Sequence, residues 1–434
     1  MAGNPPAERM NHMEQRIQLF PGVWLQCVQT QRFKSACLSI SLLRPLRREE
    51  AAMNALLANV LIQGSQNHPD LQSISQAADR LYGASIGPLV RKNGEIQTWG
   101  LYAGFLEDRF APARDPVLEP VARLLGELLL QPRLENGGFS AGYVEREKNN
   151  LINTIESALN DKQAYADRQM LQAMCSQDNF GVPRLGNVED VQAITPDSLY
   201  RHYQAALASS PVEIFYAGSA PAQAVAGLLT EVLADLPRAG LVPLPYRPLG
   251  RRDTPQYREQ AMPLAQAKLS MGFTTGITAA SPDFPALMVF NALFGGDLTS
   301  KLFQTVREKL SLCYYASSAV YGAKGILTVS SGILTENYDR VKGEILRQLA
   351  ACQAGEITPA ELSAAQETIC SSLRTVTDTV GRMEDYAMFC QLSRFTLSPE
   401  AYRQAVTAVT LADAARVARQ VQLDTIFFLK GVGE

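Results

Sequence analysis

Histidine is the residue on which most hydrolytic and metal-dependent sites depend, and it is scarce in this chain. The 434 residues include three histidines, His12, His68 and His202, which lie far apart. A histidine acting as a general base needs an orienting partner. A histidine metal site usually places two imidazoles at helical or hairpin spacing. Neither pattern is present, so histidine spacing indicates neither a hydrolase nor a metal site.

The seven cysteines give no alternative metal or nucleophile site. They are scattered and odd in number, and no CxxC pair occurs. This distribution argues against a zinc ribbon and against a disulfide framework. A cysteine nucleophile is disfavoured because no histidine is placed to activate it. We expect reduced thiols in a cytoplasmic protein.

Composition favours a large folded protein over a nucleic-acid or membrane binder. The chain has 40 Lys+Arg against 43 Asp+Glu, a net charge of −3, and 46% hydrophobic residues. Such a balance gives no basic surface for nucleic acid or for anionic lipid. The longest apolar run, 284–294, is too short to span a bilayer. Residues 1–14 lack a basic region followed by an apolar one, and we expect a flexible leader there.

The elements of the first half form a strand–helix–hairpin–helix pattern. Residues 48–63 have one apolar face and end at Gly64, which predicts a helix. Residues 84–91 and 95–103 are predicted strands joined at Asn93-Gly94, a strong hairpin signal. Residues 140–175 are predicted to form one long helix. These features predict an N-terminal α+β domain over 15–236.

The second half repeats this pattern after a change in composition. Residues 237–263 are rich in proline and poor in large apolar residues, which predicts a linker. A strand, a helix, a hairpin over 311–333 and long helices then follow. The sequence therefore predicts two homologous α+β domains, 15–236 and 264–434, each with an antiparallel sheet flanked by helices.

Three segments resemble the pitrilysin/insulinase-like (M16) zinc metallopeptidases. Residues 300–314 read SKLFQTVREKLSLCY, similar to the family's SRLFQEVREKRGLAY. Residues 145–155 read EREKNNLINTI, similar to its EREKxVVLEEI helix. Residues 55–65 read ALLANVLIQGS, similar to HFLEHMLFKGT, its metal-binding helix. The resemblance covers nearly the whole chain and implies the same fold, which forms half of a clam shell.

The resemblance also implies that the metal site is degenerate. The family's HxxEH motif supplies two zinc ligands and the general base. The matching positions here are Ala55, Ala58 and Asn59, and the position of the third ligand is Thr154. Glu147, seven residues before Thr154 on the same helix face, does match a family carboxylate, but one carboxylate cannot hold zinc. We therefore expect no metal, no cofactor and no catalytic residue.

A second pair of family residues is intact. In active members an Arg and a Tyr seven residues apart bind the peptide near the scissile bond and help to stabilise the oxyanion. The matching residues are Arg307 and Tyr314, and the neighbouring Tyr315 leaves open which phenol faces inward. In two-subunit members this pair comes from the partner of the zinc-bearing subunit.

The chain resembles the non-catalytic YmfF-like members of the family, which occur in Gram-positive bacteria beside a catalytic YmfH-like sister. The resemblance implies an inactive subunit that closes over a zinc-bearing sister, binds extended peptide and supplies Arg307 and Tyr314. An alternative is a scaffold protein that retains only the fold and could form a homodimer, and in which Arg307 pairs with a nearby carboxylate. An independent enzyme with an unrelated site is the weakest hypothesis.

The predicted edge strand Ser85–Val90 also leaves two possibilities open. In the family, the corresponding strand captures peptide by adding it to the sheet. Pro88 removes one backbone donor, which could instead blunt this edge against pairing.

Overall fold

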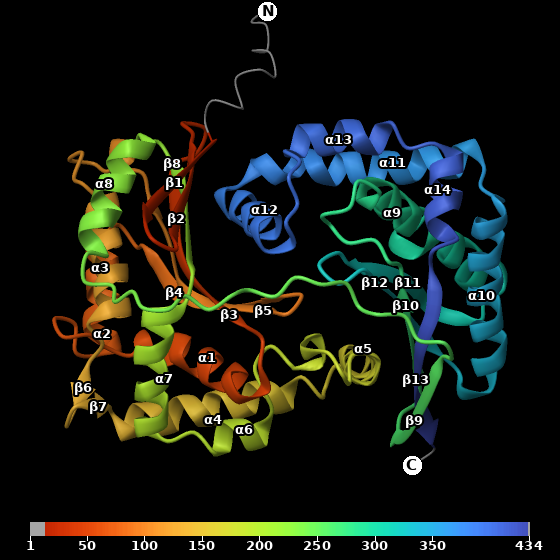
Figure 1. The fold of residues 1–434 in the computed structure, drawn as a ribbon, viewed down its shortest axis with the longest axis horizontal. Coiled ribbons are helices and arrows are strands. Elements are labelled where there is room, and N and C mark those ends of the chain that lie inside the picture. The colour runs from red at the N-terminus through yellow and green to blue at the C-terminus, as the bar shows by residue number, and fades with distance from the viewer. Residues whose placement is uncertain (1–13, 433–434) are drawn as a thin grey trace, which may run out of the picture. The chain divides into compact units, whose positions relative to one another are not determined.

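The computed structural model describes residues 14–432, which form two compact units (Figure 1). Unit 1 contains the described residues up to Ile155, together with Val182–Pro245 and Thr377–Met388. Unit 2 contains Glu156–Gly181, Tyr246–Val376 and the described residues from Phe389 on. The leader predicted at 1–14 lies outside the described residues, except for Glu14. No described helix is long and apolar enough to cross a bilayer.

Unit 1 is built on a six-stranded sheet with the order β1-β2-β8-β3-β5-β4. Its strands are β1 (Glu14–Phe20), β2 (Val23–Gln29), β3 (Ser35–Pro45), β4 (Ser85–Asn93), β5 (Ile96–Leu106) and β8 (Val212–Gly218). The β4–β5 hairpin turns at Asn93-Gly94, as the sequence predicts, and Gly94 adopts a positive φ of 54°. Because β2 runs parallel to β8, the sheet is mixed and not antiparallel as predicted.

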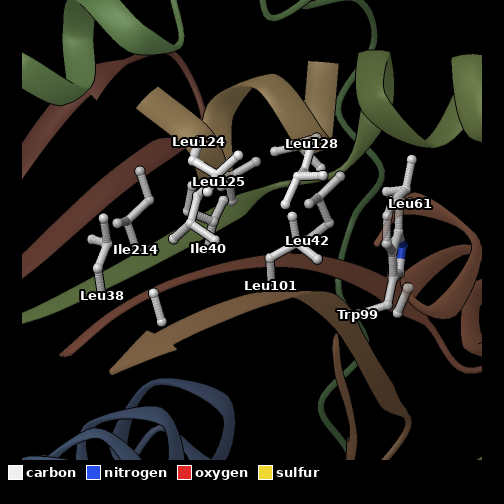
Figure 2. Close-up of a cluster of buried hydrophobic side chains, with 14 of the residues drawn as sticks. Leu38, Ile40, Leu42, Leu61, Trp99, Leu101, Leu124, Leu125, Leu128 and Ile214 are labelled. Atoms are coloured by element: carbon white, nitrogen blue, oxygen red, sulfur yellow. The ribbon is translucent and has the colours of Figure 1, made fainter. Parts of the chain in front are cut away.

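Helices cover one face of this sheet and form the main core of unit 1. They are α1 (Arg48–Leu61), α2 (Leu71–Arg80), α3 (Leu118–Leu130), α4 (Ala141–Ser157), α6 (Val188–Gln192), α7 (Pro196–Ser209) and α8 (Ala222–Val232), beside the short hairpin β6 (Leu134–Glu135) and β7 (Gly138–Phe139). Figure 2 shows Leu124, Leu125 and Leu128 of α3 facing Ile40 and Leu42 of β3. Alternate strand residues share a face, so this side of β3 is continuously apolar.

Unit 2 has a five-stranded sheet with the order β11-β12-β10-β13-β9. Its strands are β9 (Gln256–Pro263), β10 (Ala267–Thr274), β11 (Cys313–Tyr321), β12 (Ile326–Ile333) and β13 (Gln422–Val432). β9 occupies residues that the sequence assigns to the linker, and it pairs in parallel with β13. This sheet is therefore mixed as well.

The helices of unit 2 come from three stretches of the chain. They are α5 (Lys162–Met174), α9 (Phe284–Asn291), α10 (Tyr338–Ala354), α11 (Pro359–Arg374), α13 (Pro399–Thr407) and α14 (Leu411–Ala418), with two π-helical segments, η4 (Ala292–Gly296) and η5 (Leu302–Lys309). Thr358 and Thr410 begin α11 and α14 with capping boxes, which satisfy helix-terminal N–H groups. α12 (Val380–Ser393) crosses the boundary between the units.

The two sheets share one topology, which confirms the predicted α+β fold. In each sheet, an edge hairpin (β4–β5 or β11–β12) pairs with a central strand (β3 or β10). The next strand across the sheet (β8 or β13) is the last strand of its unit in the sequence, and it pairs in parallel with β2 or β9. The order and the sense of the strands agree. β1 is the additional strand of unit 1.

The single long helix predicted over 140–175 is wrong. The chain breaks into α4, which ends at Ser157, and α5, which begins at Lys162. Asp161 caps α5 by accepting hydrogen bonds from the backbone N–H groups of Gln163 and Ala164. A side-chain acceptor before the first turn is a typical helix start. The break separates α4, nearly all of which belongs to unit 1, from α5 in unit 2.

Candidate functional site

A pocket of about 340 Å³ in unit 1 is lined by two of the four positions that correspond to the family's metal site, Asn59 and Thr154. It lies between the end of α1, the edge strand β4, the middle of α4 and the segment before α6. Eleven residues line it: Asn59, Pro88, Leu89, Val90, Arg91, Glu147, Asn150, Leu151, Thr154, Arg184 and Leu185. Asn59, Glu147 and Thr154 are thus brought to one pocket, while Ala55 and Ala58 are not among its lining residues.

The α1 positions are unable to bind a metal. Ala55 and Ala58 are both 0% exposed and belong to the apolar core. Neither side chain carries a donor atom. The Asn59 amide nitrogen donates to the Ala55 carbonyl oxygen at 2.9 Å. At the positions where the family motif presents its two imidazoles and its general base, this helix therefore has two alanines and an asparagine that is hydrogen-bonded to the helix backbone.

Of the two α4 positions, one retains a carboxylate, Glu147, and the other is Thr154. Glu147 is 7% exposed and accepts hydrogen bonds from Arg146 Nε at 3.3 Å and from Asn150 Nδ2 at 3.2 Å. The Thr154 hydroxyl donates to the Asn150 carbonyl oxygen at 2.8 Å. Glu147 is therefore held by neutral and cationic donors of its own helix.

These residues do not fit a zinc ion. Tetrahedral zinc needs three or four N, O or S ligands, and the pocket offers one carboxylate already bonded to Arg146. Within residues 14–432, no group of three or more His, Cys, Asp or Glu side chains is placed to bind a metal. No step of zinc-assisted hydrolysis is therefore assigned to this chain.

The edge strand β4 borders the pocket, and one hydrogen-bonding group on its free edge is already used by an arginine of the same unit. Pro88 lies opposite Leu101 in an unbroken register with β5. Proline has no N–H, so it is tolerated where the backbone faces away from the ladder. Arg184 Nη1 donates to the Val90 carbonyl oxygen at 2.7 Å. The free edge therefore lacks a donor at Pro88 and has its acceptor at Val90 already paired.

Arg307 lies in unit 2 on the π-helical segment η5. Its side chain is 41% exposed, and its Nη1 lies 3.1 Å from Oε1 of the adjacent Glu308. The guanidinium also stacks over the Phe303 ring at 4.6 Å. π-Helical turns are rare and often mark functional sites. The pairing with Glu308 is exposed, and such pairs stabilise a protein weakly.

The two adjacent tyrosines have different surroundings. Tyr314 is 57% exposed and lies at a bulge of β11, where the register shifts between Cys313 and Tyr315. The Tyr315 hydroxyl donates to Gln163 of α5, and its ring lies near Gly332 of the neighbouring strand. Tyr315 is therefore used within unit 2, whereas the Tyr314 phenol is exposed to solvent.

The two described histidines have structural roles. His202 Nε2 lies 2.7 Å from Asn54 Oδ1, and Asn54 donates to Gln97 at 2.9 Å. Burial lowers the pKa of His202 to about 4, so the ring is neutral at pH 7. His68 Nδ1 lies 3.1 Å from a Glu127 carboxylate oxygen in a polar loop. His12 lies outside the described residues.

Sequence reasoning did not identify Arg184 as a pocket residue. Arg184 belongs to a segment without periodic apolar residues, between α5 and α6. Only the three-dimensional arrangement brings it to Val90 and the pocket. The sole sequence signal is a lone arginine between Pro183 and Leu185, which predicts nothing specific.

Comparison with known proteins agrees with this degenerate site. A family model described as "Peptidase M16 inactive domain" matches residues 193–369. The "Probable inactive metalloprotease YmfF" of Bacillus subtilis is 29% identical over 97% of this chain and 99% of its own length. An uncharacterized zinc protease of Mycobacterium leprae is 23% identical over 72% of this chain and 70% of its own length.

A solved structure shares the fold over nearly the full length. A conserved protein from Enterococcus faecalis superposes with a TM-score of 0.90 at 29% identity, covering 97% of this chain and 99% of that one. The matched family model, the full-length relative and the donorless α1 positions are consistent with one another. The chain is thus similar to M16 peptidase-like proteins, including one named as a probable inactive metalloprotease.

Proposed function

We propose that this chain is the non-catalytic subunit of a two-subunit M16 peptidase. It pairs with a zinc-bearing M16 sister, binds an extended peptide and supplies Arg307 and Tyr314 to the sister's site. The sister provides the metal and the general base. We place this complex in a bacterial cytoplasm, where the seven free thiols remain reduced.

The observation that carries this proposal is the contrast between the two units. In unit 1 the α1 metal-site positions Ala55 and Ala58 are buried in apolar packing. In unit 2 Arg307 and Tyr314 keep exposed polar ends, and the ion pair of Arg307 is an exposed one with its neighbour. Exposed Arg and Tyr side chains are available to a ligand, and both residue types are common anchors in interfaces.

The test is a double substitution, Arg307→Ala with Tyr314→Phe, in the complex with its sister. We expect peptide hydrolysis to fall about 100-fold or more, because loss of one oxyanion donor costs on the order of 10²–10³ in rate. The zinc content and the stability of the complex should not change. Hydrolysis of a quenched fluorescent peptide measures the effect.

Matched controls are Arg340→Ala and Tyr257→Phe, because both residues are exposed and lie in unit 2. We expect these substitutions to leave the rate within about twofold of the unmodified complex, since surface changes rarely matter. A double variant that is as active as the controls would support the scaffold hypothesis. In that case Arg307 and Tyr314 are retained without a role in peptide processing.

A further inference from the structure

The pocket beside the former metal position contains one guanidinium that has no carboxylate partner in the described part of the chain. Arg91 lines it but is paired with Glu384 and Asp385. Glu147 also lines it and is paired with Arg146. Arg184 is the third charged lining residue, and within residues 14–432 it makes no ion pair. Arg184 is therefore the lining guanidinium that has no carboxylate partner among the described residues.

Arg184 has donors to spare. Its Nη1 donates to the Val90 carbonyl oxygen at 2.7 Å, which is a neutral acceptor. A guanidinium has five N–H donors in a fixed fork that suits two carboxylate oxygens. The surrounding protein lowers the pKa of Arg184 through desolvation, with no carboxylate opposing that effect. The bond to Val90 thus fixes the fork beside the pocket and leaves most of its donors for a ligand.

The remaining lining suits a short polar group on an apolar chain. Asn59 and Asn150 each use their amide nitrogen once, for Ala55 and Glu147 respectively. Each amide therefore retains a second N–H. Leu89, Leu151 and Leu185 supply apolar walls. Neutral amide donors beside a guanidinium favour an anion of limited charge over a cation.

We propose that this pocket binds a carboxylate of an extended peptide through Arg184. The inference rests on the proposed function only in taking the ligand to be a peptide, since the pocket lies entirely within unit 1. The carboxylate is either the C-terminus of the peptide or an Asp or Glu side chain, because both present the same two oxygens. A charge-assisted bidentate contact with Arg184 replaces the lost metal contact at this position.

The experiment measures peptide binding by the full chain alone, without its sister, using fluorescence anisotropy. Three labelled, N-acetylated peptides of alternating leucine and serine are compared. One ends in a free carboxylate, one ends in an amide, and one ends in an amide but has a central glutamate. We expect at least one carboxylate peptide to bind about tenfold more tightly than the neutral amide at low salt.

The variants test whether Arg184 is the cause. Arg184→Gln should abolish the preference for carboxylate, because it removes the charge but keeps a donor for Val90. Arg184→Lys should retain part of the preference, since charge remains without the fork. Arg80→Gln is the matched control: Arg80 is an exposed arginine of α2 in the same unit. It should leave the preference unchanged.

The proposal is overturned if all three peptides bind equally, or if Arg184→Gln keeps the preference. It is also overturned if Arg80→Gln loses the preference equally, which indicates a diffuse charge effect. Should Arg184→Gln fail to fold, Arg184→Lys and the salt dependence of the unmodified chain decide the matter, because a carboxylate contact weakens as salt rises. Failure here leaves the pairing with a zinc-bearing sister untouched, because that is measured by hydrolysis in the complex.

Discussion

Arg91 and Glu384, 293 positions apart in the sequence, form a two-pronged ion pair with N–O distances of 2.7 and 2.6 Å. Glu384 is 1% exposed and also accepts a hydrogen bond from the Ser39 hydroxyl at 3.0 Å. Nearby, Val380 and Ala387 pack on Cys37 and other residues of the sheet face opposite the main core. These contacts fix the segment Thr377–Met388 on unit 1.

Removing Arg91 should destabilise unit 1 strongly. Arg91→Ala leaves the Glu384 carboxylate buried with Ser39 as its main partner. We expect a loss of about 2–4 kcal/mol, near the lower end for a broken buried pair, because the Arg91 side chain is 30% exposed. Both tryptophans of the chain, Trp24 and Trp99, lie in unit 1, so urea unfolding followed by tryptophan fluorescence reports on this unit.

The control for Arg91 is Arg48→Ala, because Arg48 also lies in unit 1. Arg48 pairs with Asp190 at 3.5 Å, and its side chain is 65% exposed. Such a pair contributes at most about 1 kcal/mol. If Arg91→Ala costs no more than this control, the ion pair does not fix the segment.

Restoring a ligand at Ala55 should damage the fold before it binds any metal. Ala55 is fully buried among apolar residues of unit 1, so Ala55→His overpacks the core and buries a polar ring. We expect a cost of about 1–3 kcal/mol. Ala224→His on the exposed face of α8 is the matched control and should cost less than about 1 kcal/mol. Equal urea midpoints for the two variants would contradict the account of a filled site.

Acid should destabilise unit 1 through His202. Its folded pKa of about 4 lies below the ordinary value of 6.5, so the unfolded chain binds a proton first as the pH falls. The contribution of neutral His202 is complete above pH 6.5 and is lost between pH 6.5 and 4, by on the order of 1–3 kcal/mol. His202→Gln keeps a donor for Asn54 and should flatten this slope. An unchanged slope in His202→Gln would contradict the assignment.

Glu213 should lower the stability of unit 1 as the pH rises, whereas His202 lowers it as the pH falls. Burial raises its pKa to about 7 despite the Arg16 guanidinium, which donates to it at 2.5 Å. In the folded state the Glu213 carboxyl group therefore keeps its proton at pH values above 4.5, the ordinary pKa of a glutamate. This stabilisation is complete below pH 4.5 and is lost as the pH rises through 7.

The measurement for Glu213 compares Glu213→Gln with Glu231→Gln. Glu231 is an exposed glutamate near the end of α8. Stability curves between pH 4.5 and 8 should show a smaller alkaline loss only for Glu213→Gln. If both variants keep the slope of the unmodified chain, Glu213 titrates normally.

Local features of the fold could be predicted from the sequence, and long-range ones could not. The Asn93-Gly94 hairpin and the strand Ala267–Thr274 follow from turn chemistry and apolar patterning. The break at Asp161 could not be predicted, because an aspartate that caps a helix has the same sequence signature as an aspartate on the surface of a continuous helix. β9 reads QYREQAMP, has no alternation of apolar and polar residues, and lies at a sheet edge, so its sequence resembles a linker. The parallel pairing of β9 with β13 depends on residues far apart in sequence.

The site shows the same division. The resemblance places Asn59, Glu147 and Thr154 together, and they do line one pocket. Arg184 joins that pocket through a tertiary contact with Val90 that no local pattern encodes. The π-helical form of the Arg307 segment is equally invisible, because its spacing fits an ordinary helix.

The most direct test of the central claim is purification of the tagged chain from its own cell. The account predicts that the chain alone contains no zinc and hydrolyses no peptide. It also predicts that an M16 sister, identified by mass spectrometry, co-purifies as a zinc-loaded and active complex. A chain that elutes alone or only with itself, with no M16 peptidase bound, would contradict the account and support a scaffold. Hydrolysis by the isolated chain in the presence of a chelator would contradict it as well, and would indicate an independent enzyme.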